Sequence, residues 1–216
     1  MRYILWALLI VGPVLLLGGC AAVSREQCQA GDWTALGVTD GATGHPSDRL
    51  SKIAEDCGRY GITPDSSAYM AGWHKGVQTY CTPENGFSLG RRGRKASAIC
   101  PPALNADFEP AYDLGHRLWA AEDRVGEIEA DIRRLEREIS NGEFRLMTVN
   151  CHHAKDHGHR EECRDDVRDA HFDLQSARFD LMNLHMELYQ AQQDYEATKA
   201  EVNAAAPAHI PGFTPQ

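Results

Sequence analysis

The residues best suited to chemistry are clustered in one short stretch that cysteines close at both ends. Four of the ten histidines fall between Cys151 and Cys163, namely His152, His153, His157 and His159. Imidazoles beside carboxylates suit Zn²⁺ or another divalent transition metal. One hypothesis is therefore a metal site, although the spacing fits no standard zinc finger. The alternative, which we favour, is a polar, partly protonatable turn.

No arrangement typical of an enzyme accompanies these histidines. The sequence shows no nucleophile beside a base, no paired carboxylates in an apolar setting and no cofactor-binding loop. His74 and His116 are candidate polar residues in a groove, but lone histidines are more often structural. We therefore expect a protein without catalytic activity.

A basic cluster lies between Cys81 and Cys100, in what reads as a turn-rich loop. It consists of Arg91, Arg92, Arg94 and Lys95. The loop lacks the lysine and hydroxyl spacing of a phosphate-binding P-loop. These side chains are candidates for binding anions such as lipid headgroups, lipopolysaccharide phosphates or peptidoglycan carboxylates, whereas the reading that we favour is a solvated loop.

The other cysteines point to disulfide bonds. Apart from Cys20, six cysteines remain, and an even number in an exported chain is typical of a disulfide framework. Six cysteines allow fifteen pairings, and the sequence does not choose among them. Nearest-neighbour pairing is our prediction, because each pair would then bracket one local unit: Cys28 with Cys57, Cys81 with Cys100, and Cys151 with Cys163.

The first 19 residues read as an export signal. Arg2 precedes an apolar run that is too short to span a membrane comfortably. The run ends in Leu17-Gly18-Gly19-Cys20, which resembles the lipobox of bacterial lipoprotein precursors. That resemblance implies cleavage before Cys20 and attachment of acyl chains to it, which would tether the protein to a bilayer. Ala21, rather than Asp, follows the cysteine, so we expect the outer membrane, on its periplasmic side.

The elements that position the histidine-rich stretch are two long amphipathic segments within residues 107–205, with the tip at 150–163. Apolar or small residues recur there at alternating steps of three and four, the a/d repeat of a coiled coil. The pattern predicts an antiparallel two-helix hairpin. Facing residues would have numbers that sum to 316, which places Gly142 opposite Leu174 and Ile132 opposite Leu184.

Charge is distributed unevenly along the chain. The formal net charge is −9, and the excess of Asp and Glu lies after residue 106. An acidic hairpin argues against nucleic acid as a partner and is typical of a solvated helical face.

Residues 20–106 read as a small helical domain rich in cysteine and glycine. Ser24 to Gln27 has the form of a capping box, so we expect a helix from about Arg25 that carries Trp33. Further helices are expected from Pro46 to about Cys57 and from Thr63 to about Cys81. Glycines recur after aromatic residues in this region. Close helix packing is the explanation that we favour, and a ligand groove is the alternative. Residues 206–216 are expected to be disordered.

Several motifs in this region resemble a known family. They are Trp33-x3-Gly37-x2-Asp40-Gly41-x2-Gly44, Tyr80-Cys81-x-Pro83-Glu84-Asn85-Gly86-Phe87-x2-Gly90 and Cys100-Pro101. The resemblance is to an uncharacterised family of proteobacterial envelope lipoproteins, classed as a domain of unknown function, and covers about residues 20–120. Nothing functional can be carried over from this resemblance to residues of this chain.

The sequence thus predicts an all-α protein in which a disulfide-bonded helical domain precedes a long coiled-coil hairpin. We expect a lipid-anchored periplasmic protein with an interaction or structural role, and an envelope protein or peptidoglycan as its partner. The alternative is a protein that binds a metal or small ligand at the histidine-rich tip or the glycine-rich groove.

Overall fold

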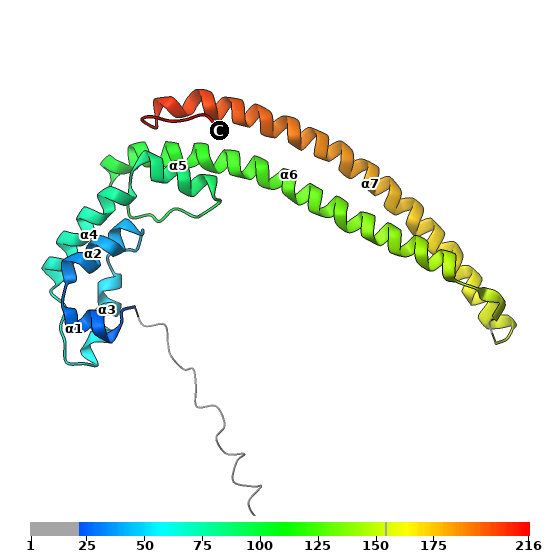
Figure 1. Ribbon diagram of the computed structural model, residues 1–216, viewed down its shortest axis with the longest axis horizontal. Coiled ribbons are helices and arrows are strands. Elements are labelled where there is room, and N and C mark those ends of the chain that lie inside the picture. The colour runs from blue at the N-terminus through cyan, green and yellow to red at the C-terminus, as the bar shows by residue number, and fades with distance from the viewer. Residues whose placement is uncertain (1–21, 154) are drawn as a thin grey trace, which may run out of the picture. The chain divides into compact units, whose positions relative to one another are not determined.

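The computed structural model describes residues 22–153 and 155–216, and these residues form helices and turns without any strand (Figure 1). The all-α prediction is therefore confirmed. The signal segment 1–19 and Cys20 lie outside the described residues. Within the described residues, no helix is both long and apolar enough to cross a membrane. The chain divides into two units, and each is described by itself.

The first unit comprises residues up to 81 together with 97–101. Its helices are α1 (Arg25–Ala30), α2 (Trp33–Ala42), α3 (Arg49–Gly58) and α4 (Ser66–Tyr80). The predicted capping box is present, because the Ser24 hydroxyl accepts from the Gln27 amide and the Gln27 side chain accepts from the Ser24 amide. Its helix does not continue to Trp33, however. Gly31 ends α1 in the left-handed conformation, and Asp32 caps a new helix.

Two disulfide bonds cross-link this unit. Cys28 pairs with Cys57, and Cys81 pairs with Cys100, at Cα–Cα distances of 5.5 and 5.6 Å. These are the nearest-neighbour pairs that the sequence analysis expected. Cys28 and Cys57 are almost fully buried, as are Ile53 and Tyr69 of the same unit, and the buried residues of this unit are few. Covalent links therefore supplement a core that is small for independent stability.

The second unit comprises residues 82–96 and 102–216. It contains α5 (Pro83–Arg91), α6 (Pro102–Thr148), η1 (Cys151–His153), α7 (His157–Ala205) and η2 (Ala206–Ala208). Two sequence-based boundaries are corrected here. Pro83–Arg91 form a helix capped by Thr82, not a loop, and residues 82–96 group with the hairpin instead of the preceding domain. The reason is that α5 packs closely on the start of α6.

Helices α6 and α7 run side by side in opposite directions, so the hairpin prediction is confirmed (Figure 1). We call the line of contact between α6 and α7 the seam. One buried cluster of the seam consists of Ile128, Ile132 and Ala191, and Leu184 and Leu188 pack against it. The side chain of Leu174 lies over Gly142, where a Cβ would come within 2.7 Å of it. Both observations agree with facing residues whose numbers sum to 316.

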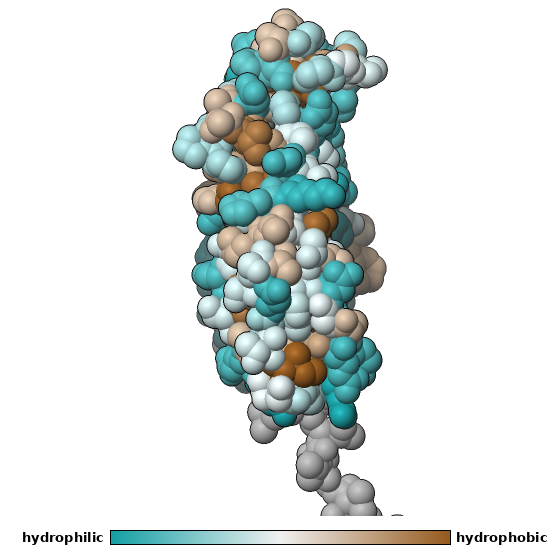
Figure 2. Space-filling view, turned by 90° about the vertical axis from the view of Figure 1, so that its left-hand side faces the viewer, coloured by the Kyte–Doolittle hydropathy of each residue, from teal (hydrophilic) through white to brown (hydrophobic). Residues whose placement is uncertain are grey.

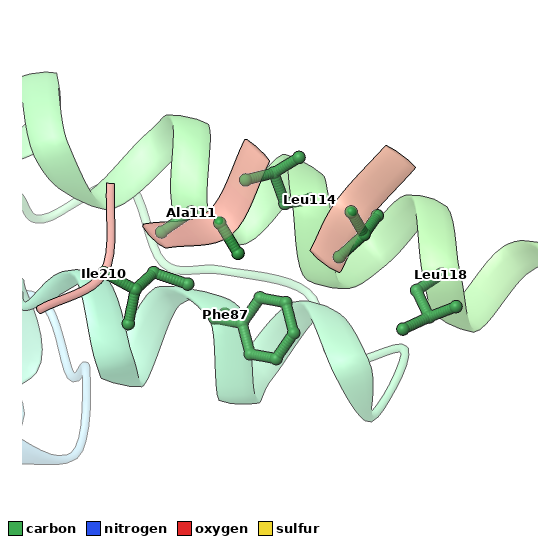
Figure 3. Packing of buried hydrophobic residues seen from close by; sticks show 7 residues of the cluster. Phe87, Ala111, Leu114, Leu118 and Ile210 are labelled. Atoms are coloured by element: carbon green, nitrogen blue, oxygen red, sulfur yellow. The ribbon is translucent and has the colours of Figure 1, made fainter. Parts of the chain in front are cut away.

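The C-terminal segment is ordered, which corrects the prediction that residues 206–216 are disordered. Ala206 and Ile210 are buried in one cluster with Phe87, Leu114 and Leu118 (Figure 3). The ring of Phe213 packs edge-on against Phe87, with 5.4 Å between the centroids. The prolines and alanines of this segment could not reveal that α5 and α6 leave an apolar surface for Ile210 to cover.

Candidate functional site: the hairpin and its tip

The tip of the hairpin is closed by the Cys151–Cys163 disulfide, with 5.7 Å between the Cα atoms. Asp156 caps the first turn of α7 and accepts from the backbone amide of His159. That hydrogen bond, with a second from the His159 ring, lowers the pKa of the exposed Asp156 carboxyl below its ordinary value. The local sequence therefore builds a capped, cross-linked turn.

The tip histidines do not converge on a common point. Nδ1 of His159 lies 2.9 Å from Asp156, whereas Nδ1 of His157 lies 3.5 Å from Glu161. His152 and His153 are exposed in η1. Among the described residues, no three His, Cys, Asp or Glu side chains are placed to hold a metal ion. The tip cysteines are in a disulfide, so their sulfurs are not thiolate ligands.

The basic cluster is divided between an ion pair and a turn. Arg91 ends α5 and pairs with Glu122, 2.7 Å away. Arg92, Arg94 and Lys95 follow in an exposed turn around Gly93, whose φ is +62°. A carboxylate therefore already pairs with the first of the four side chains, and anion binding by the cluster stays a prediction.

The recurrent glycines have a packing role in both units. In α2, a Cβ on Gly37 or Gly41 would overlap backbone atoms of α4, and in α5 a Cβ on Gly90 would overlap backbone atoms of α6. The backbones of these helices are in direct contact, and the partner helix occupies the space beside each of these glycines. The packing explanation therefore accounts for the glycines, and they do not line an open groove.

The two candidate histidines outside the tip lie next to aromatic side chains. His74 is exposed, and its ring lies edge-on to Trp73. His116 is half-buried between the rings of Tyr112 and Trp119.

A buried polar group that the sequence did not single out lies in the first unit. Asp40 is only 3% exposed, accepts from the Tyr69 hydroxyl at 2.8 Å and pairs with Arg49 at 3.3 Å. Burial, followed by the hydrogen bond to this carboxylate, raises the pKa of Tyr69. The neutral tyrosine and the arginine therefore connect the Asp40 carboxylate of α2 to α4 and to α3.

The first described residue is held against the first unit. The Ala22 amide donates to Asp56 at 2.6 Å, and the Ala22 carbonyl accepts from Arg49 at 2.7 Å. Asp56 is itself almost fully buried, and the neighbouring Val23 is buried too. Ala22 is two residues after Cys20, so these contacts lie close in sequence to the candidate lipidation residue.

Five large apolar side chains of α7 are exposed and recur at regular intervals along the helix. They are not among the site residues predicted from the sequence. We call this set the outer stripe, and the exposed fractions are 72% for Phe172, 59% for Phe179, 52% for Met182, 56% for Met186 and 65% for Tyr189. Figure 2 shows one face of the molecule, on which hydrophobic residues form small spots separated by hydrophilic ones. The sequence did contain a signal for the stripe, because its residues recur at steps of seven, three, four and three. Each stripe residue lies two positions before a seam residue of α7.

The comparisons with known proteins give one finding. Residues 32–117 match the family model described as "Protein of unknown function (DUF2799)", so a domain of this family spans them. The matched stretch includes the glycine-mediated packing in both units and ends near the start of the hairpin. No curated protein and no solved structure matches the chain.

Proposed function

We propose that this protein is a lipid-anchored lipoprotein of the bacterial envelope, and that it binds another protein through its helical hairpin without catalysing a reaction. The observation that carries the interaction role is the outer stripe of α7. Five large apolar side chains, each more than half exposed, lie along one helix. Exposed large apolar side chains that gather on one face of a helix mark interaction sites.

The tether rests on the sequence around Cys20 and on the contacts of Ala22. Gly18-Gly19-Cys20 follows an apolar run, as in lipoprotein precursors. Asp56 and Arg49 hold the backbone of Ala22, so only about 7 Å of chain would separate an acylated Cys20 from the folded domain. The first unit would then lie at the bilayer surface. Three disulfides fit the oxidising periplasm.

The tether is tested by following the protein through cell fractionation and by mass spectrometry of its mature amino end. We expect a diacylglycerol-modified Cys20 and recovery with the outer membrane. Cys20→Ala should block processing and lipid attachment, whereas Gln29→Ala, a change on the exposed face of α1, should leave both unaltered. An unmodified Cys20 in the wild-type protein would contradict the tether.

The interaction role is tested by placing a photo-crosslinking residue in the full-length lipoprotein and irradiating living cells. Position Met186 probes the outer stripe, and exposed Arg133 on α6 serves as the matched control away from it. We expect a discrete protein adduct at Met186 and none at Arg133. Absence of any adduct along the stripe would argue against an interaction arm.

A further inference from the structure

The outer stripe has the spacing of a second coiled-coil seam. Its steps of seven, three, four and three keep the 3.5-residue repeat that places side chains along one line of a helix. Each stripe residue lies two positions before a seam residue, as Phe172 does relative to Leu174. At about 100° per residue, two positions correspond to a rotation of about 200° around the helix axis. Measured the shorter way round, a stripe side chain therefore lies roughly 160° from the seam side chain that packs on α6. The stripe therefore faces away from α6.

The narrowness and charge of the stripe favour a helix as its partner over a membrane surface. A helix that lies in a bilayer interface has a wide apolar face and a polar face rich in Lys and Arg. Here the apolar line is one residue wide at each turn, and Asp173, Asp180 and Glu187 each follow a stripe residue directly in sequence, outside the edge positions that a partner helix would meet. Acidic side chains would be repelled by anionic headgroups.

The stripe is complementary to itself in the antiparallel direction. When two copies are arranged with facing numbers that sum to 361, Phe172 of one copy faces Tyr189 of the other, and Phe179 faces Met182. Gln175 faces Met186 in the same register. Each pair joins an a position to a d position, as antiparallel coiled coils require. A two-fold axis then relates the copies, so that the same patch serves both.

The edges of the stripe contain no carboxylate between residues 176 and 192, although the chain has 31 Asp and Glu residues. The six edge positions, which would lie beside a second helix, are Ser176, Arg178, Asn183, His185, Gln190 and Gln192. Arg178 is already paired with Glu143 of α6, at 2.6 Å. Two copies of an acidic helix can therefore approach along this line without placing acid against acid.

The exposed area is sufficient for a weak dimer. At roughly 150–250 Å² per aromatic side chain and the exposed fractions given above, the three aromatic residues offer roughly 300–500 Å² per copy. The two methionines extend this area. Two copies would bury roughly 1,000 Å², near the lower limit for a specific interface.

We propose that α7 pairs with α7 of a second copy through the outer stripe, in the antiparallel register whose facing numbers sum to 361. The inference rests on the proposed role of the hairpin as an interaction arm and names the partner as the protein itself. Because the area is modest, the acyl-free chain dimerises with a dissociation constant on the order of micromolar.

Analytical ultracentrifugation of the oxidised, acyl-free mature chain tests the pairing. We expect a concentration-dependent monomer–dimer equilibrium, and Phe179→Glu should weaken it at least tenfold. Phe144→Glu is the matched control, since Phe144 is an equally exposed phenylalanine on the outer face of α6. It should leave the equilibrium unchanged. Circular dichroism should show the same helicity in all three proteins, because both phenylalanines face solvent.

The register is tested by a photo-crosslinking residue at Met182 in the same acyl-free protein. Mass spectrometry should locate the adduct at or next to Phe179 of the second copy, whereas a parallel pairing would place it at residue 182. A protein that stays monomeric up to about 100 µM, or a dimer insensitive to Phe179→Glu, overturns the inference. If the stripe still crosslinks to a different protein in cells, the proposed interaction role stands while self-pairing fails; if neither occurs, both fail.

Discussion

Single glycines determine how closely the helices of this protein approach. Gly37, Gly41 and Gly44 recur at steps of four and three, and Gly86, Gly90 and Gly93 repeat those steps in the second unit. The last glycine of each set has positive φ, and a Cβ there would overlap an aromatic ring, of Tyr80 in the first set and Trp119 in the second. The same local solution thus occurs twice, with an aromatic ring covering the end of each helix pair.

Gly41→Ala should therefore destabilise the first unit. The added Cβ would meet the Trp73 carbonyl oxygen, a backbone atom that cannot move aside, and overpacking of this kind costs about 1–3 kcal/mol. Gly126→Ala is the control, because a Cβ there meets nothing within 4 Å, and alanine in an open helix position adds up to about 1 kcal/mol. Urea unfolding followed by circular dichroism measures both, and equal effects would contradict the close packing.

The cap of α7 should respond to acid. Hydrogen bonds from His159 lower the pKa of Asp156 in the folded state below its ordinary value of 3.8. The charged cap therefore stabilises the start of the helix fully at pH values above 3.8. That contribution is lost as the pH falls through the lower folded pKa. An NMR titration should show the His159 amide keeping its hydrogen-bonded shift down to the ordinary value of 3.8 and losing it only at lower pH. Asp156→Asn keeps an acceptor that does not titrate, and should abolish this change.

At the scale of elements, the hairpin depends on both a continuous seam and a terminal brace. Buried Ile128, Ile132 and Ala191 hold its middle, and exposed pairs such as Arg124 with Glu187, 3.3 Å apart, bridge the two arms. Exposed pairs contribute little individually. The base of the hairpin is instead held by the C-terminal segment, which covers α5 and α6 with Ile210.

Ile210→Ala should lower the free energy of unfolding of the second unit by about 2–4 kcal/mol, because it removes a buried branched side chain from a packed cluster. His209→Ala, at the adjacent exposed position, should change it by less than about 0.5 kcal/mol. Chemical denaturation of the two variants gives the comparison. If both changes proved equally harmless, the segment would not be packed on α5 and α6.

For the molecule as a whole, the two units rely on different sources of stability. The first unit has two disulfides that close stretches of 29 and 19 residues around a small core. The second has one disulfide, which closes only 12 residues at the tip, and long helices that pack along their length. Redox conditions should therefore affect the units unequally.

Reduction of all three disulfides should unfold the first unit before the hairpin arms. In the chain-entropy treatment each bridge contributes roughly 3 kcal/mol, so the first unit would lose roughly 6 kcal/mol. Hydrogen exchange of the reduced and alkylated protein should show lost protection in α2 and α4 but retained protection around Ile132 and Leu184. The oxidised protein is the reference, and uniform loss across both units would contradict this difference.

The sequence alone determined the features that depend on local pattern. The a/d repeat predicted the hairpin and the pairing of Gly142 with Leu174, since helix periodicity is a property of the chain itself. The Ser24 cap was accessible in the same way, whereas the sequence left fifteen cysteine pairings open and the structure selected the nearest-neighbour set. Only the tertiary structure decided that 82–91 is a helix packed on α6, that 206–216 is ordered, and that the outer stripe of α7 is left exposed. These depend on which surfaces meet, and an apolar residue is buried or exposed according to what lies opposite it.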